Sequence, residues 1–127
     1  MKDYDQALKS LQAISGGTEA EISVLGKAIL DISDNTKYAA SELTQGAIYV
    51  AQAGFTASES LEVVAAAAKG AQGTLEPLTT AADLLTTVLR AFHIDASDAS
   101  SVMDTLAVAA NKSKTDLEGM RVVFNYL

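Results

Sequence analysis

The chain has 127 residues, a net charge of −7, no cysteine, and a hydrophobic fraction of 49% with only 6% aromatic residues. This length supports one hydrophobic core, so we expect residues 1–127 to form a single domain, and the hydrophobic fraction excludes a disordered polyampholyte. Scattered basic residues and a pI near 4.5 exclude a surface built to grip nucleic-acid phosphates. The absence of cysteine excludes disulfides and thiol chemistry, and the richness in small aliphatic residues favours closely packed helices.

The sequence does not predict membrane insertion. Residues 1–5 turn acidic at once and lack the apolar run of a secretory signal. The longest uncharged stretch, residues 43–58, contains several polar residues and falls short of the roughly 20 apolar residues that a spanning helix needs. We therefore expect a soluble protein.

Clear start and stop signals delimit the first two predicted helices. Apolar residues at helical spacing predict a helix over residues 4–14, which Ser15, Gly16 and Gly17 end. Thr18 and Glu21 then have the spacing of a capping box, in which each side chain accepts a hydrogen bond from the other residue's amide. The two apolar faces are Tyr4, Ala7, Leu8, Leu11 and Ile14, and then Ile22, Leu25, Ile29 and Ile32 in a helix that runs to about Asn35.

Residues 49–59 predict a hinge between a third and a fourth helix. Gly54 ends the third helix, because glycine adopts the left-handed conformation without a Cβ penalty. Thr56 and Glu59 form a second predicted capping box at the start of the fourth helix. The third helix starts between Ala39 and Ser41 and buries Leu43, Ala47, Val50 and Ala51, and the fourth spans residues 57–72, buries Leu61, Val64, Ala65 and Ala68, and is closed by Gly73.

The fifth helix has the clearest apolar pattern, and we expect it to lie at the centre of the core. Thr74 is predicted to cap it, and Pro77 fits its first turn because a missing amide is no loss there. The helix ends near His93. Its apolar face comprises Leu78, Ala81, Ala82, Leu85, Val88, Leu89 and Phe92.

Two more helices complete the pattern. Asp95 or Ser97 caps the sixth helix, and Thr115 with Glu118 forms a third predicted capping box before the seventh. The sixth helix presents Ala99, Val102, Met103, Leu106 and Ala110, and the seventh Met120, Val123, Phe124 and Leu127. Because this last pattern has no stop signal, we expect the chain to be a fragment of a longer protein.

These signals predict an all-α fold, a compact bundle or layered array of about six to seven short antiparallel helices. No alternating pattern typical of strands occurs, and the helix starts recur at uneven intervals, which argues against a strict solenoid but leaves helix pairs stacked in a curved layer open. Mid-helix glycines at Gly26, Gly46 and Gly70 are explained equally well by close helix crossings or by a surface that must later unfold.

Several short motifs follow one another in a characteristic order and spacing. They are Ala51 to Phe55, the helix Ser58 to Ala68, Ala81 to Asp83 followed by Arg90 to Phe92, Val102 to Ala107, Ala109 to Ser113 and Phe124 to Leu127, with Asn35 to Tyr38 ahead of them. In the order and spacing of these motifs, residues 41–127 resemble the tape measure proteins of tailed phages. Two positions depart from the family pattern. His93 replaces a usual glycine, so that turn must tolerate a side chain, and Ala39 replaces a polar cap.

The resemblance implies a non-enzymatic structural role in the virion tail, in tail assembly and length determination. It also implies tail tube and tail assembly proteins as partners, with self-association open, and synthesis in the cytoplasm of a bacterial host. Physical reasoning restricts that role, because 127 residues in one continuous helix would span only roughly 190 Å and the repeated caps fold the chain back on itself. We therefore expect a compact module attached to an extended remainder.

No catalytic, cofactor-binding or metal-binding residue is predicted. His93 is the only histidine and sits where a helix C-terminus favours positive charge, which leaves no histidine-based metal cluster or catalytic triad. Asp83 and Asp104 could pair as a general acid and base, although bonds to helix ends or exposure to solvent are the simpler interpretation. Asp95 and Asp98 are simpler as cap residues, and Met103, Met120, Phe92 and Phe124 as core residues.

Two alternatives stay open at this point. One is a membrane-active helical module acting in genome ejection, although helices without basic polar faces bind anionic bilayers poorly. The other is a cytosolic helical adaptor with a groove for a specific partner. Sequence-specific binding to nucleic acid is not expected.

Overall fold

The computed structural model describes residues 2–74, 76–113 and 116–125, and these are helical throughout, apart from short connections. The predicted all-α fold is confirmed. The elements are α1 (Lys2–Ser15), α2 (Glu19–Asn35), α3 (Ala40–Gln52), α4 (Ala57–Ala71), α5 (Leu78–Ala91), the 3₁₀ turn η1 (Ala96–Asp98), α6 (Ala99–Ser113) and α7 (Leu117–Phe124).

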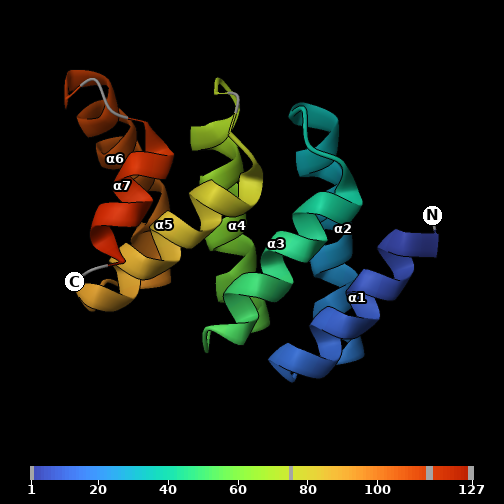
Figure 1. Ribbon diagram of the computed structural model, residues 1–127. Coiled ribbons are helices and arrows are strands. Elements are labelled where there is room, and N and C mark those ends of the chain that lie inside the picture. Colours follow the sequence, from blue (N-terminus) through green and yellow to red (C-terminus); the bar gives the residue numbers. More distant parts are fainter. Residues whose placement is uncertain (1, 75, 114–115, 126–127) are drawn as a thin grey trace.

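The helices form an array of two layers that follows the order of the chain (Figure 1). One layer contains α1, α3, α5 and α7, each of which packs on the next, and the other contains α2, α4 and α6. The chain therefore crosses between the layers at each connection, so that consecutive helices run in opposite directions and pack across the layers. The sequence left open a compact bundle or a layered array of short antiparallel helices, and the structure shows the layered array.

α4, and not α5, lies at the centre of the array. It contacts α1, α2, α3, α5, α6 and η1, whereas α5 contacts α3, α4, α6 and α7. The expectation that the fifth helix would be central was wrong, because α4 carries small side chains on several sides and neighbours can approach it from all of them. Its buried residues are Ala57, Ser60, Val63, Val64, Ala66, Ala67, Ala68 and Ala71, while the predicted Leu61 and Ala65 are only half-buried.

Local capping signals confirm most of the predicted helix ends. Thr18 with Glu21 and Thr56 with Glu59 form complete capping boxes. Gly54 follows the end of α3 with φ +106°. At the start of α3, Ala39 occupies the cap position without a side-chain hydrogen bond. Asp95 caps η1, which leads directly into α6, and it does so by accepting a hydrogen bond from the Ser97 amide.

Two predicted caps differ from the structure. Thr74 does not cap α5; its hydroxyl donates to the Ala71 carbonyl at 2.7 Å and accepts from the Glu76 amide at 3.2 Å, so it closes the end of α4. Pro77 occupies the N-cap position of α5, one residue before the first turn. At α7, Thr115 lies outside the described residues, and Asp116 is the N-cap, accepting from the Gly119 amide at 2.8 Å.

The end of α5 shows how a side chain replaces the usual glycine. His93 has φ +55°, the left-handed conformation. The Ile94 amide donates to the Leu89 carbonyl at 2.8 Å and the His93 amide to the Arg90 carbonyl at 3.4 Å. These are the two hydrogen bonds of a Schellman motif, which satisfies carbonyls that the end of a helix leaves free. His93 thus tolerates the backbone geometry that the sequence required of it.

Close helix crossings account for two of the three mid-helix glycines. A Cβ at Gly26 would lie 2.9 Å from the Tyr4 hydroxyl, and one at Gly70 would lie 2.4 Å from Cγ of Met103. Tyr4 also donates a hydrogen bond to the Gly26 carbonyl at 2.7 Å, which ties α1 to α2. At Gly46 a Cβ would make only ordinary contacts at 3.5 Å.

The predicted core is largely confirmed, and the predicted core residues that are exposed lie near helix ends. Phe92 was predicted to be core but is 56% exposed, because it follows the last residue of α5 and points past the packed face. Ile14 and Val123, also near helix ends, are exposed as well, and Leu127 lies outside the described residues. Among the described residues, no helix is both long and apolar enough to cross a bilayer.

Candidate functional site

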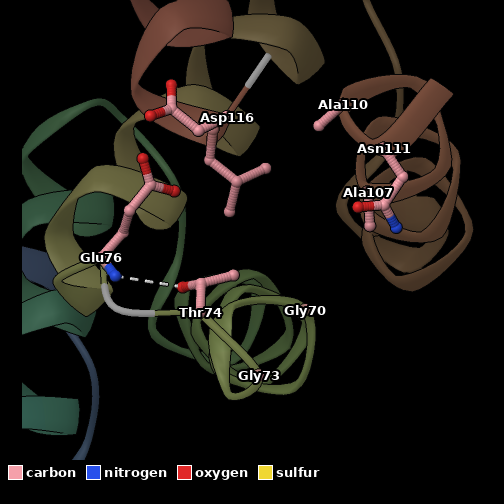
Figure 2. Close-up of a pocket in the computed structure, with 9 residues that line it drawn as sticks. Gly70, Gly73, Thr74, Glu76, Ala107, Ala110, Asn111 and Asp116 are labelled. Carbon is pink, nitrogen blue, oxygen red and sulfur yellow. Dashed lines mark hydrogen bonds between the residues drawn. The ribbon is translucent and has the colours of Figure 1, made fainter. Parts of the chain in front are cut away.

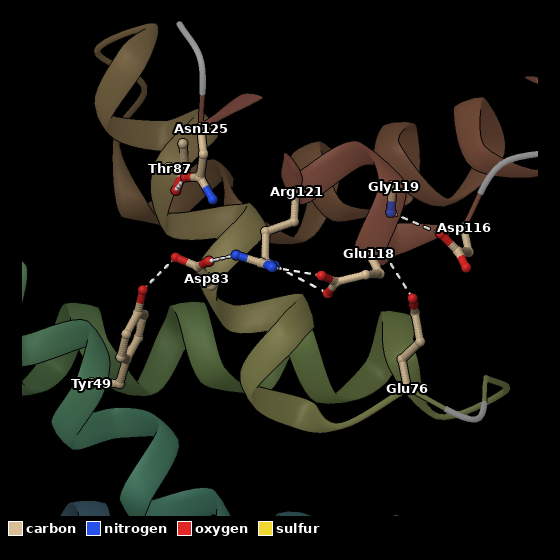
Figure 3. A network of polar contacts seen from close by, with 9 residues as sticks. All are labelled: Tyr49, Glu76, Asp83, Thr87, Asp116, Glu118, Gly119, Arg121 and Asn125. Atoms are coloured by element: carbon tan, nitrogen blue, oxygen red, sulfur yellow. Dashed lines mark hydrogen bonds and ion pairs between the residues drawn. The ribbon is translucent and has the colours of Figure 1, made fainter. Parts of the chain in front are cut away.

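A polar network joins α3, α5 and α7 on one side of the array (Figure 3). Asp83, on α5, stands at its centre: one carboxylate oxygen accepts a hydrogen bond from the Tyr49 hydroxyl, and the other pairs with the Arg121 guanidinium at 3.2 Å. Arg121 also forms a two-pronged contact with Glu118, one turn earlier on α7, through Nη2 at 2.5 Å and Nε at 3.1 Å. Three helices that are distant in sequence are therefore linked through one carboxylate.

The charges in this network shift one another in the expected directions. The hydrogen bond to Arg121 lowers the pKa of Glu118, and the bonds to Glu118 and Asp83 raise the pKa of Arg121. Burial, and then the hydrogen bond to Asp83, raise the pKa of Tyr49 to about 12. The Tyr49 hydroxyl is neutral, and the Asp83 carboxylate is engaged by both Tyr49 and Arg121. Neither group of this network is therefore free to act as a general base.

A second set of contacts holds the start of α7. The Glu118 amide donates to Oε1 of Glu76 at 2.7 Å, and the Gly119 amide donates to Asp116. Carboxylates are favourable at this position because the first amides of a helix have no intrahelical partner and carry partial positive charge. Glu76 and Asp116 therefore accept hydrogen bonds from amides that would otherwise be unpaired at the start of α7.

Both of these carboxylates border a pocket of about 480 Å³ between the ends of α4 and α6 and the start of α7 (Figure 2). Gly70, Gly73 and Thr74 form one wall. Figure 2 shows Asn111 and Ala107 on the facing helix, with Asp116 and Glu76 on the remaining side. The small residues of the wall leave this space open. Within the described residues, no group of three or more His, Cys, Asp or Glu side chains is arranged to hold a metal ion.

The structure separates the residues that the sequence singled out for chemistry. Asp83 is engaged by Tyr49 and Arg121, whereas Asp104 is exposed on α6, and the two share no hydrogen bond or ion pair in the described part of the chain. The acid and base pairing considered from the sequence is therefore not formed. His93 is exposed at the end of α5.

The residues expected in the core behave less uniformly. Met103 is buried against Gly70, and Met120 and Phe124 are partly buried. Phe92 packs edge to face on Phe124 with ring centroids 6.3 Å apart, so the exposed ring still links α5 to α7. This contact belongs to the same side of the array as the polar network.

Sequence reasoning did not identify the network itself. The spacing of Glu118 and Arg121 is the one available signal, because residues three apart on a helix are neighbours. The partners Tyr49 and Asp83 are 34 residues apart, and Asp83 and Arg121 are 38 apart, so nothing local marks them.

Comparison with known proteins gives one family. Residues 26–127 match the family model described as phage-related minor tail protein. A curated relative, the tape measure protein of Pneumococcus phage Dp-1, is 25% identical over 125 residues, which cover 98% of this chain but 11% of the relative. No solved structure matches the chain. Since the family model covers most of the sequence and the fold is helical throughout, the chain belongs to the phage-related minor tail protein family.

Proposed function

We propose that the chain is a structural module of a phage or prophage tape measure protein, acting in tail assembly and length determination through helix-helix contacts. The family match over residues 26–127 carries this proposal, and the name of the relative from Pneumococcus phage Dp-1 supports it. Because the chain corresponds to 11% of that relative, residues 1–127 would form one helical domain within a longer protein.

The geometry supports a compact module over a measuring rod. The longest helix, α2, has 17 residues and spans about 26 Å. Each connection reverses the direction of the chain, so the length of the array does not grow with residue number as the length of a single helix does. The extended remainder of the protein would set the tail length, and this module would anchor or organise it.

The surface suits contacts with other tail proteins. Several large apolar side chains are exposed, among them Val24, Val108 and Val123. The net charge of −7 would keep the module from adhering to DNA that passes through the tail. We propose tail tube and tail assembly proteins as partners, with self-association as an additional contact, after synthesis in the host cytoplasm. No catalytic, cofactor or metal site is part of this proposal.

The test is an in-frame deletion of the segment encoding residues 1–127 from the phage genome, with tails measured by electron microscopy. A matched control deletes 127 residues from a predicted continuous helix elsewhere in the same gene. We expect the control to shorten tails by roughly 190 Å, while deletion of the module reduces tail yield without that shortening. Shortening by the same amount in both, or normal tails after deletion of the module, would contradict the proposal.

A further inference from the structure

α7 is attached to the array differently from the other helices. Within its eight residues, only Leu117 is buried, whereas α5 buries Leu and Ala side chains along its whole length. Met120 and Phe124 are partly buried, and Val122 and Val123 are 43% and 62% exposed. α7 packs on α5 and, less extensively, on α6. Apolar burial, the main source of helix stability in proteins, is therefore small for this helix.

Polar contacts along α5 add to this limited apolar attachment of α7. The side chains of Asp83 and Thr87 meet those of Arg121 and Asn125 at 3.2 and 3.3 Å. Asp83 and Thr87 are four residues apart, and their partners Arg121 and Asn125 are also four residues apart, in the same order along the chain. The helices α5 and α7 are therefore parallel and in register. Ahead of α5, Glu76 holds the Glu118 amide. Figure 3 shows these contacts in a row along the length of α7.

These contacts are accessible to solvent and ions. The side chains of Arg121, Asp83 and Glu118 keep 30%, 21% and 47% of their surface exposed. Partly exposed ion pairs contribute little individually and are screened by salt. The pocket of about 480 Å³ beside Leu117 also removes packing contacts from the start of α7.

From these observations we propose that α7 is a strap, fastened to α5 by a few apolar contacts and by partly exposed polar contacts, which detaches as a unit while α1 to α6 stay folded. Detachment uncovers the side of α5 that carries Asp83 and Thr87, together with the apolar side chains that Leu117 and Phe124 contact. Ionic strength controls this detachment, because salt weakens the ion pairs of Arg121 but does not weaken the apolar packing around α4.

Amide hydrogen exchange on the 127-residue chain tests this proposal. We expect α7 amides such as those of Met120 and Asn125 to exchange faster than amides in α4, which serve as the internal reference. Raising NaCl from about 0.05 M to about 0.5 M should speed α7 exchange about two- to fivefold relative to α4. Exchange of α7 and α4 at one common rate, with the same response to salt, would overturn the proposal.

Two variants separate the strap from a general loss of stability. R121Q should speed α7 exchange at low salt and abolish most of its salt response, while K9Q, which removes the same charge from exposed Lys9 on α1, should leave α7 unchanged. Because the chain has no cysteine, T87C with N125C introduces two thiols without competitors, at two positions whose native side chains are in contact. Oxidation should slow α7 exchange to the α5 rate, and reduction should restore it. No change on oxidation, or equal effects of R121Q and K9Q on α7, would refute the strap.

Discussion

Substitution H93G should stabilise the protein, because glycine adopts the left-handed backbone conformation at this position without the steric cost of a Cβ atom. His93 has φ +55° and is exposed, and its backbone completes the Schellman motif at the end of α5. This conformation costs a residue with a side chain about 1–2 kcal/mol. Glycine avoids that cost but loses about 0.4–1 kcal/mol more conformational entropy on folding. The expected net gain is about 0.5–1 kcal/mol.

Thermal and urea denaturation measure this gain. For a domain of this size the melting temperature should rise by about 2–4 °C. H93A is the matched control, since alanine removes the imidazole but keeps the backbone cost, and we expect little change. G54A is the reciprocal test: a Cβ there meets nothing within 4 Å, yet φ is +106°, so the loss of about 1–3 kcal/mol would come from the backbone alone. A destabilised H93G, or an equal gain in H93A, would refute the reasoning.

Three further predictions concern caps, packing and alkaline pH. T18A and T56A should each cost about 1 kcal/mol of unfolding free energy in urea, because each opens a capping box, and an effect near zero in both would contradict the assigned cap geometry. G70A should destabilise by about 1–2 kcal/mol despite the better helix propensity of alanine, because its Cβ would lie 2.4 Å from Cγ of Met103; the smaller M103A side chain should relieve the added cost in the double variant, and additive effects would argue against the contact. Since the folded pKa of Tyr49, about 12, lies above its ordinary value of 10.0, its contribution to stability is complete below pH 10 and is lost as pH rises towards 12. Y49F should reduce this alkaline loss in urea titrations at pH 9 and 11, and an unchanged loss would contradict the assignment.

Local signals predicted the helices well because each depends on a few neighbouring residues. The Thr18 and Thr56 capping boxes and the Gly54 stop require only residues within one turn, so the sequence contains all the necessary information. Thr74 misled for the same reason. It has the residue type and position of a cap, but its hydroxyl donates a hydrogen bond to the Ala71 carbonyl and so closes α4.

The positions of the helices in the array were harder to predict from the sequence than the helices themselves. The fifth helix has the strongest apolar stripe and was expected at the centre, yet α4 is central because alanines leave it room for neighbours on several sides. A one-sided stripe marks a helix with one packed face, whereas a helix surrounded by others needs small residues in many directions. The run of alanines from Ala65 to Ala68 is that pattern in the sequence of α4.

The polar network could not be predicted because its partners meet only after folding. The sequence marked Asp83 only as a possible acid or base partner of Asp104, whereas its pairing with Arg121 depends on α5 and α7 lying parallel in one layer. Only the Glu118 and Arg121 pair, on a single helix, was within reach of spacing arguments.

Frequent helix caps fold this member of the minor tail protein family into a compact array that cannot act as an extended rod. Small-angle X-ray scattering of the 127-residue chain tests it directly. A layered array of this length predicts a radius of gyration of about 14–17 Å. A continuous helix of roughly 190 Å would give about 55 Å, and a value near that figure would contradict the account.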